Sequence, residues 1–354
     1  MSYTNGLDDP SSVFQTVIYT GNATARAITF DGNSDMQPDW VWGKQRSGTD
    51  SHQVSDSVRG ATKKLNPDTN AAEDTTSTHV TAFNSNGFSV GTGGGYNGNT
   101  ITQVAWSWKA GTSFTNDASS TSIGSIDSAG SVNDTAGFSI CTHTGTGSNA
   151  TIKHGLSTAP KVIITKKTSA SGGWQVGHES IGWQNGIYLE DTGASTGDAG
   201  AWNSTAPTSS IFYVGNSSFT NQSSATYVSY IFAEKKGYSK FGSYTGNGNA
   251  DGTFVYTGFK PAFVMVKNTA ISEQWSMHDN KRNDNVIPNY ARLVADDSQA
   301  EATNTTFAKV ELLSNGFKLG NSADVINDAS VKFIYMAFAE QPFVTSTGVP
   351  TTAR

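Results

Sequence analysis

The amino-acid sequence predicts an all-β protein built from three tandem β-sandwich modules of about 100 residues each. Composition is the first reason: only 15% of the residues are charged, whereas 11% are aromatic and 37 are glycine. A polar but weakly charged chain with many aromatic residues and turns is typical of β structure. The second reason is that short apolar runs bounded by turn residues recur along the chain. The third is an internal threefold repeat.

The repeat is marked by features that return in the same order. Each unit begins with a Thr-Gly turn, at 20–21, 144–145 and 245–246. A proline follows each turn and opens an apolar run that ends in lysine; the three pairs are Pro38 and Lys44, Pro160 and Lys166, and Pro261 and Lys267. An acidic residue comes next, at Asp56, Glu179 and Asp279. Three such agreements of spacing and residue type predict a tandem repeat.

Each unit is predicted to consist of strands. The run after each proline is too short for a helix, and a proline is tolerated at the start of a strand because its missing N–H is harmless there. An aromatic run closes each unit, at 104–108, 228–232 and 334–338. In the first of these runs Trp106 and Trp108 share one face, as the period of two in a strand requires. Asn-Gly pairs, as at Asn86-Gly87, predict tight turns between strands. A unit of this size with several short strands is most simply a β-sandwich.

The repeat also predicts the domain boundaries. We expect a terminal arm over 1–12, modules over 13–110, 138–236 and 237–343, a linker or long loop over 111–137, and a tail over 344–354. The linker is predicted because 111–137 is rich in Ser, Thr and Gly and has few large apolar residues. The second and third modules are expected to pack rigidly, because the segment between them leaves little slack.

Charge, hydropathy and cysteine content exclude several classes of protein. The net charge of -6 provides no electrostatic footprint for nucleic acid. No apolar run approaches the roughly 18 residues needed to span a bilayer, so no membrane insertion is expected. The single cysteine, Cys141, excludes a disulfide framework and a multi-cysteine metal site. The N-terminal residues lack the pattern of a secretory signal, so synthesis in a cytoplasm is expected.

The candidate chemical motifs have simpler structural explanations. His178-Glu179 and His278-Asp279 are neighbours on predicted strands, so their side chains point to opposite faces and do not meet one substrate. The glycines at 91–95 lead into another strand rather than into a helix, unlike a phosphate loop. The Asp-rich turns at 31–35 and 247–252 could coordinate Ca²⁺ or be simple Asx turns, and this alternative stays open. We therefore predict no catalytic residue, no metal site and no cofactor.

Two tryptophans are candidates for ligand contact. Trp183 and Trp202 lie among Gly, Asn and Ser in a segment without a clear strand pattern, close to Asn185 and Asn203. Aromatic rings that stack on sugar faces, beside amides that bind hydroxyl groups, are typical of carbohydrate contact. The same tryptophans could instead close the open end of a sandwich. Both interpretations stay open here.

Several sequence strings are distinctive enough to indicate a family. DSVRGATK, FNSNGFSVG, AWSWKAG, HGLSTAPKVIITKK, FGSYTGNGNADGTF and MAFAEQPF, together with the threefold spacing, resemble a tandem-repeat domain of tailed bacteriophages, mostly of marine bacteria. Proteins with this domain are usually labelled tail-fibre or virion structural proteins, and the resemblance spans roughly residues 14–343.

The resemblance implies a non-enzymatic component of the particle surface. The implied function is that of a tail-fibre or receptor-binding protein that contacts the host, and the implied partners are other virion proteins and a host surface glycan. By analogy with such assemblies we expect a homotrimer.

Two alternatives to a tail fibre remain open. The chain has no heptads, collagen-like repeat or β-helical shaft, which leaves room for a capsid decoration or head-fibre protein. From another class, a carbohydrate-active depolymerase would need two carboxylates facing one cleft about 5–10 Å apart.

Overall fold

The computed structural model describes residues 6–282, 291–303 and 308–351, and it confirms the all-β prediction. The α-helices in this part of the chain have one turn each; they are α1 (Gly94–Asn97), α2 (Ala118–Thr121), α3 (Ala199–Trp202) and α4 (Asp324–Asn327). Two short 3₁₀ helices accompany them, η1 (Pro10–Ser12) and η2 (Glu179–Ile181). No helix in the described ranges is long and apolar enough to cross a membrane.

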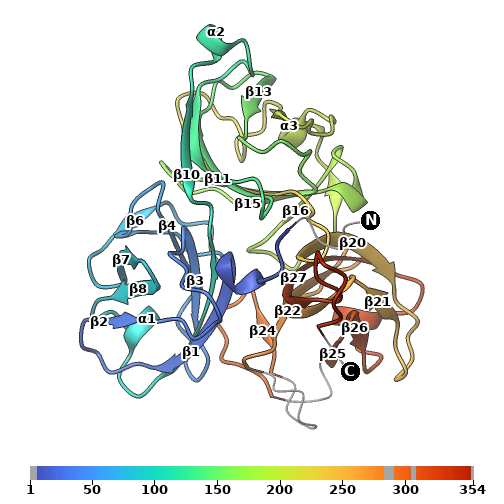
Figure 1. The fold of residues 1–354 in the computed structure, drawn as a ribbon. Helices are drawn as coiled ribbons and strands as arrows, with labels where there is room; N and C mark the ends of the chain where they lie inside the picture. The colour runs from blue at the N-terminus through green and yellow to red at the C-terminus, as the bar shows by residue number, and fades with distance from the viewer. Residues whose placement is uncertain (1–5, 283–290, 304–307, 352–354) are drawn as a thin grey trace.

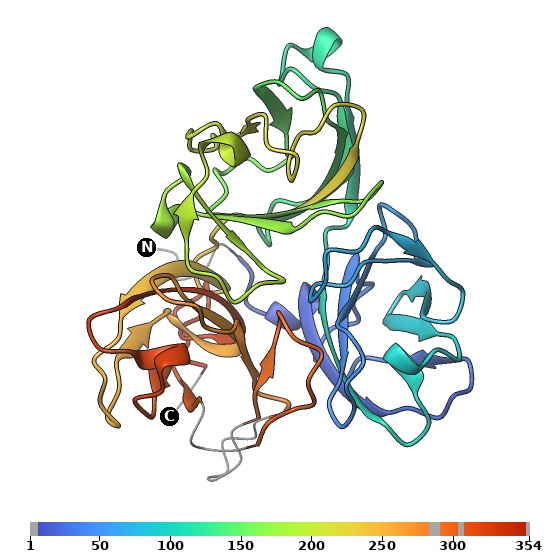
Figure 2. The ribbon, with the colours of Figure 1, turned by 180° about the vertical axis from the view of Figure 1, so that it is seen from behind.

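The strands fall into three groups, which we call units 1, 2 and 3. They form three lobes around a common centre, blue, green and orange-red in Figures 1 and 2. Unit 1 has a main sheet of order β1-β9-β3-β4, a second sheet of order β2-β8-β7 and a small pair β5-β6. The bounds are β1 (Phe14–Thr20), β2 (Arg26–Ile28), β3 (Trp40–Gln45), β4 (Gln53–Asp56), β5 (Lys63–Lys64), β6 (Asp74–Thr75), β7 (Val80–Asn84), β8 (Gly87–Val90) and β9 (Thr102–Trp108).

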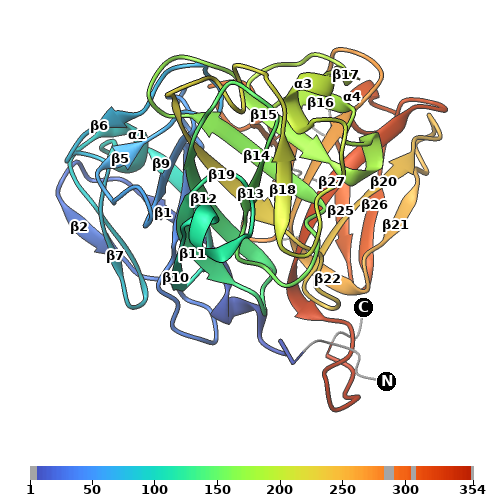
Figure 3. The same cartoon turned by 90° about the horizontal axis from the view of Figure 1, so that it is seen from above.

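Unit 2 has the largest sheet, with the order β10-β11-β12-β19-β14-β15-β16-β17. The strand pair β13-β18 lies across one face of this sheet (Figure 3). The bounds are β10 (Thr112–Asn116), β11 (Ser128–Asn133), β12 (Phe138–Thr144), β13 (Ala150–Lys153), β14 (Val162–Lys167), β15 (Trp174–His178), β16 (Asn185–Tyr188), β17 (Thr196–Gly197), β18 (Ile211–Val214) and β19 (Thr226–Phe232).

Unit 3 repeats the plan of unit 1, with a main sheet β20-β27-β22-β23-β24 and a second sheet β21-β26-β25. The bounds are β20 (Ser239–Thr245), β21 (Phe254–Tyr256), β22 (Phe259–Asn268), β23 (Ser276–Asp279), β24 (Leu293–Val294), β25 (Val310–Leu313), β26 (Gly316–Leu319) and β27 (Lys332–Pro342).

The predicted linker at 111–137 is instead part of unit 2. It contains β10, α2 and β11, which extend the main sheet beyond β12. A linker was predicted because these strands carry small polar residues, many of them exposed. Gly130 on β11 is one of these small residues. A Cβ there would lie 1.9 Å from the Ile140 carbonyl oxygen of the neighbouring strand, so the close approach of the two strands requires glycine.

The main sheets of all three units share one hydrophobic core. Trp40 of unit 1 stacks on Tyr230 of unit 2 with ring centroids 4.4 Å apart, and Trp108 meets Phe338 of unit 3 at 5.4 Å. Phe232 of unit 2 also contacts Phe338, at 5.7 Å. Units 1 and 2 each have a further core between the main sheet and the second layer of strands. The aromatic strands predicted to be core therefore hold the units together as well as stabilising each one.

Strand register corrects one position of the repeat. Two places after its proline, each unit has a residue that pairs with the end of the next strand. These pairs are Trp40 with Asp56, Val162 with His178 and Phe263 with Asp279. The prediction that Glu179 is the counterpart of Asp56 was therefore wrong by one residue. Glu179 begins η2 and forms a surface ion pair with Lys161. A shift of one residue reverses the face of a strand, so the difference matters.

These three positions connect the units in a closed ring. Asp56 of unit 1 accepts a hydrogen bond from the Tyr230 hydroxyl of unit 2 at 2.8 Å, and Asp279 of unit 3 accepts one from Trp106 Nε1 of unit 1 at 2.9 Å. His178 Nε2 of unit 2 lies 3.3 Å from the Tyr335 carbonyl oxygen of unit 3. Each unit thus uses the same strand end to contact the last strand of the next unit.

A second set of contacts follows the same threefold order. The residue two places after each repeat lysine accepts a backbone hydrogen bond from a neighbouring unit. The three bonds run from Glu73 N to Thr168 O at 3.0 Å, from Ser195 N to Thr269 O at 3.0 Å and from Glu301 N to Arg46 O at 2.7 Å. The repeat in sequence therefore encodes a pseudo-threefold ring within one chain.

A buried asparagine holds the Thr-Gly turn of each unit. Asn97, Asn221 and Asn327 are fully buried. In unit 2 the Asn221 Oδ1 accepts from Thr146 N at 2.8 Å, and its Nδ2 donates to Ser148 O and Gly215 O at 2.6 and 2.7 Å. The turn passes so close that a Cβ on Gly145 would lie 2.3 Å from the Gln222 carbonyl oxygen. This packing explains the glycine that marks the repeat.

Substitution of this asparagine is expected to destabilise the fold. Asn221→Ala leaves one backbone N–H and two carbonyl groups without their partner, which should lower the free energy of unfolding by about 2–3 kcal/mol in urea denaturation. The exposed Asn149→Ala is the control, with an expected change below about 0.5 kcal/mol. Equal effects of the two substitutions would contradict the assigned role.

The ends of the described chain pack on the body of the protein. Leu7 is buried in the central core, and Asp8 accepts hydrogen bonds from the backbone and hydroxyl of Ser346. The arm predicted over 1–12 therefore contributes to the common core from residue 7 onward, whereas residues 1–5 and 352–354 lie outside the described residues.

Candidate functional site

The two tryptophans predicted to contact sugar are core residues. Trp202 is completely buried and Trp183 is 6% exposed. Their rings meet edge to face at 5.8 Å and pack over Gly177, where a Cβ would lie 2.6–2.9 Å from both rings. The prediction of ligand contact was wrong for both residues, because neither offers a free ring face. The alternative, that they close the end of the sandwich, matches their position.

The two asparagines predicted beside them stabilise turns. Asn185 lies on β16 and its Nδ2 donates to the Ile181 carbonyl oxygen at 2.5 Å. Asn203 ends α3 in the left-handed conformation with φ of 50°, and its Oδ1 accepts from Asn149 Nδ2 at 2.8 Å. The structure therefore brings the tryptophans together but does not build a surface site from the four residues.

The two Asp-rich turns use carboxylates in ion pairs. Lys281 Nζ donates to both carboxylate oxygens of Asp31 at 2.9 and 3.0 Å, and Lys318 pairs with Asp251. Within the described ranges no group of three or more His, Cys, Asp or Glu side chains is placed to hold a metal ion. Each turn thus has a protein cation beside its acid.

The exposed aromatic residues gather on unit 3, and we call this surface the aromatic site. Phe254 and Tyr256 on β21 are 45% and 56% exposed, with the buried Val255 between them. Lys240 Nζ of β20 lies 5.3 Å from the centre of the Tyr256 ring, within the range of a cation–π contact. Phe343 is also exposed, and it lines a cavity of about 200 Å³ together with Lys240, Tyr256 and others.

The pseudo-threefold symmetry supplies an internal comparison for the aromatic site. Val255 pairs with Phe317 on β26, as Ile28 pairs with Phe88 on β8 and Ile152 with Phe212 on β18. Val255, Ile28 and Ile152 are therefore equivalent positions, and all three are buried. The outward positions that flank them are Ala27 and Thr29 in unit 1, Thr151 and Lys153 in unit 2, and Phe254 and Tyr256 in unit 3. The fold is built twice without aromatic residues here, so their presence in unit 3 has no structural necessity.

The aromatic site could have been found from the sequence. The alternation Phe-Val-Tyr at 254–256 predicts two aromatic rings on one face of a strand and a buried valine on the other. This alternation was missed because tryptophans in irregular segments are the more obvious pattern for ligand contact. Comparison of the three repeats at this position would have singled it out.

Each unit also buries the lysine that ends its apolar run. Lys44, Lys166 and Lys267 are completely buried, and burial lowers the pKa of each to about 8. Their ammonium groups donate to loop carbonyls: Lys44 bonds Gln45 O and Gly48 O, and Lys267 bonds Thr192 O across the boundary with unit 2. Lys44 and Lys166 thus fix a loop of their own unit, and Lys267 also connects unit 3 to unit 2. The buried lysines therefore have a structural role, because they hold loops in place.

A cavity of about 490 Å³ lies where unit 2 faces unit 1, and two carboxylates line it. Asp117 accepts hydrogen bonds from the Ser119 hydroxyl and from Ser120 N. The bond from the hydroxyl lowers the pKa of Asp117. Asp127 accepts from Ala118 N at 2.8 Å. A glycosidase needs one carboxyl group whose pKa is raised so that it can act as a general acid. The lowered pKa of Asp117 does not suit this residue to the role of general acid.

Comparison with known proteins agrees with the single body formed by the three units. The sequence model of a domain of unknown function, DUF7483, matches residues 9–342. No curated protein sequence matches the chain. The match runs through units 1, 2 and 3 without a break, so the domain of this family is the whole ring. The chain belongs to the DUF7483 family.

Proposed function

We propose that the chain is a structural component of a tailed bacteriophage particle that contacts the bacterial host, as a tail-fibre or receptor-binding protein does. The sequence resemblance described above supports the particle location. The aromatic site carries the proposal of contact, because it places exposed rings where the two equivalent units have none.

The physical argument concerns where the protein uses its aromatic residues. Most of the aromatic rings of the described residues lie in the central and outer cores. An exposed aromatic pair costs solvation free energy unless a partner covers it, and exposed apolar clusters rimmed by polar groups mark interaction surfaces. The rim here is formed by Lys240 and by exposed Glu234 and Lys236. Such a surface suits a polysaccharide or protein of the host envelope, since rings stack on it and charged groups orient it.

Cell adhesion tests the proposed contact. Fluorescently labelled protein is expected to bind host cells, and Phe254→Ala/Tyr256→Ala should reduce binding at least tenfold while leaving the unfolding transition unchanged. Ile18→Ala is the matched control, because Ile18 is similarly exposed at 41% but lies on unit 1. Equal binding by the double variant would overturn the role of the aromatic site.

Localisation separates the proposal from its alternative. Antibody-gold labelling of particles at the tail would support a tail-fibre or receptor-binding protein. Labelling of the capsid would overturn that proposal in favour of a capsid decoration or head-fibre protein. Particles that carry no label would overturn both.

A further inference from the structure

The groove between units 1 and 2 differs from the aromatic site in its chemistry. It is the cavity of about 490 Å³ already described, within the 300–1,000 Å³ range of ligand sites. Its floor follows the sheet of unit 2: Thr115, Ala129 and Thr142 lie opposite one another on β10, β11 and β12, and Thr144 lies opposite Thr226 on β19. Thr115, Thr144 and Thr226 are exposed. The floor therefore carries hydroxyl groups from several strands: those of Thr144 and Thr226 lie one strand spacing apart, about 4.8 Å, whereas Ala129 separates Thr115 from Thr142.

One of the charged groups at the groove, Arg59, is neutralised by acids of the protein. Arg59 bonds Asp56 and Glu73 of its own unit and the Tyr230 hydroxyl of unit 2. The two carboxylates, Asp117 and Asp127, accept hydrogen bonds from α2 and its neighbours. Neither carboxylate forms an ion pair with a described residue, so a ligand meets hydroxyl groups together with two carboxylates that can accept hydrogen bonds.

The hydroxyl groups can both donate and accept. Thr142 Oγ1 donates to the Ala129 carbonyl oxygen at 3.0 Å, which leaves its oxygen lone pairs available. Thr168 and Thr226 share a hydrogen bond of 2.7 Å between their hydroxyls at the other wall. A neutral ligand with many hydroxyl groups matches this surface, because its hydroxyls can donate to the carboxylates and pair with the threonines, whereas Asp117 and Asp127 would repel an anionic ligand.

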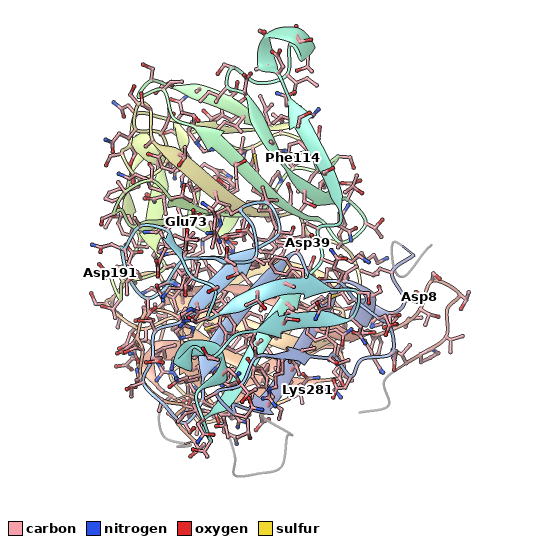
Figure 4. All side chains as sticks on the ribbon, turned by 90° about the vertical axis from the view of Figure 1, so that its left-hand side faces the viewer. Asp8, Asp39, Glu73, Phe114, Asp191 and Lys281 are labelled. Atoms are coloured by element: carbon pink, nitrogen blue, oxygen red, sulfur yellow. The ribbon has the colours of Figure 1, made fainter. Side chains whose placement is uncertain are left out.

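The outer part of the groove, which β10 and β11 form, is an addition to the repeated fold. Strands β1 and β20 form the edges of their main sheets, whereas β12 continues into β11 and β10. The added hairpin is anchored by Phe114, which packs on Gly155 and against the outer core of unit 2. Figure 4 labels Phe114 on this hairpin, above Glu73 and Asp39 of unit 1. The described strands of units 1 and 3 include no such hairpin, so its presence in unit 2 points to a use beyond stability.

We infer that this groove binds a neutral, hydroxyl-rich ligand, namely a segment of uncharged polysaccharide. The threonine hydroxyls and the two carboxylates supply hydrogen bonds, and the hairpin extends this surface beyond β12. This inference is independent of the aromatic site, which lies on unit 3.

Ligand-observed NMR with defined oligosaccharides tests the groove. The probes are neutral hexasaccharides of glucose, mannose and galactose, with a hexuronate hexasaccharide as the anionic comparison. At least one neutral probe is expected to bind, and Thr144→Val/Thr226→Val should weaken it at least tenfold. Both substituted residues are exposed, so the fold should be unaffected. Thr151→Val, on β13 away from the groove lining, is the matched control and should leave the affinity unchanged.

Three results would overturn the inference. One is failure of every neutral probe to bind to the folded protein. Another is binding of the anionic probe alone. The last is binding that survives in Thr144→Val/Thr226→Val but is lost in Phe254→Ala/Tyr256→Ala, since this would move the ligand to the aromatic site. None of these results bears on particle location, so the proposed function would be judged separately by labelling.

Discussion

Replacement of Arg282 by methionine should lower the free energy of unfolding by about 3–5 kcal/mol, the largest effect of any single substitution that we consider. The Arg282 side chain is completely buried. Its guanidinium bonds Asp279 Oδ2 at 2.5 Å, Glu301 Oε2 at 2.9 Å and the Met277 carbonyl oxygen at 3.1 Å. Methionine fills much of the volume but leaves the Asp279 carboxylate buried without its cation.

The loss should extend beyond unit 3 because Asp279 also accepts the bond from Trp106 of unit 1. Urea denaturation followed by tryptophan fluorescence measures the change. The adjacent Lys281→Met provides the control: Lys281 also pairs with an aspartate, Asp31, but the two side chains are 38% and 67% exposed. Exposed pairs contribute about 0–1 kcal/mol. If the two substitutions cost the same, the buried pair is not the point at which units 1 and 3 are held.

Acidification is expected to unfold the protein between about pH 6.5 and 4. Five of the six histidines are buried and His79 is half-buried. Burial lowers the pKa of each one. The pKa falls to about 4 for His79, His143, His154 and His178, and it falls well below 6.5 for His52 and His278. The ordinary value, near 6.5, applies in the unfolded chain.

The sign of the effect follows from proton binding. Below pH 6.5 the unfolded chain takes up protons on its histidines while the folded chain does not, so stability falls as the pH drops through this window. Each fully buried histidine contributes about 1.4 kcal/mol per pH unit while the window lasts. Burial raises the pKa of Asp68 and Asp296 to about 6, and these carboxyl groups oppose the trend because they take up protons in the folded state. The histidines outnumber them.

Urea midpoints measured from pH 7.5 to 4.5 test the expectation. The midpoint should fall steadily below pH 6.5, and the slope gives the number of protons taken up on unfolding. His143→Phe should reduce that number by one below pH 6, because His143 is buried and stacks on Tyr227 at 5.0 Å, a contact that phenylalanine can keep. A constant midpoint between pH 7 and 5 would contradict the assigned burial of the histidines.

The parts of the fold that could be predicted from sequence are those governed by local chemistry. Pro38, Pro160 and Pro261 mark the beginnings of central strands or the residues just before them, and the Thr-Gly turns need glycine because another strand of chain passes close by. Trp106 and Trp108, which the strand period places on one face, are both buried. The prolines and the tryptophans are determined by neighbours in sequence or on the same strand, whereas the turn glycines can be recognised by their recurrence in the three units.

The parts that escaped prediction depend on contacts between distant segments. The ring depends on Asp56 meeting Tyr230 and on Asp279 meeting Trp106, pairs that no periodicity connects. Unit 2 has His178 at the position of Asp56 and Asp279. A pattern that requires an acid in every unit therefore falls on the neighbouring Glu179. Composition failed at β10 and β11, because an edge hairpin of small polar residues resembles a linker until its pairing with β12 is known.

The candidate site followed the same division. Trp183 and Trp202 seemed available for a ligand because their local sequence is irregular, and only the packing over Gly177 shows that they are enclosed. Phe254 and Tyr256 carried the better signal, in a strand too short to attract attention. The groove could not be predicted at all, because one wall comes from the hairpin of unit 2 and the other from Arg59 of unit 1.

The closed ring has a consequence for how this protein can diversify. In a trimer of identical subunits, every substitution appears three times, so a change that helps at one position must be tolerated at the other two. A ring written as one chain is free of that constraint. The hairpin at β10 and β11 occurs once, and so does the aromatic pair at Phe254 and Tyr256. Covalent connection thus lets three copies of one scaffold acquire separate tasks while the shared core remains common to all.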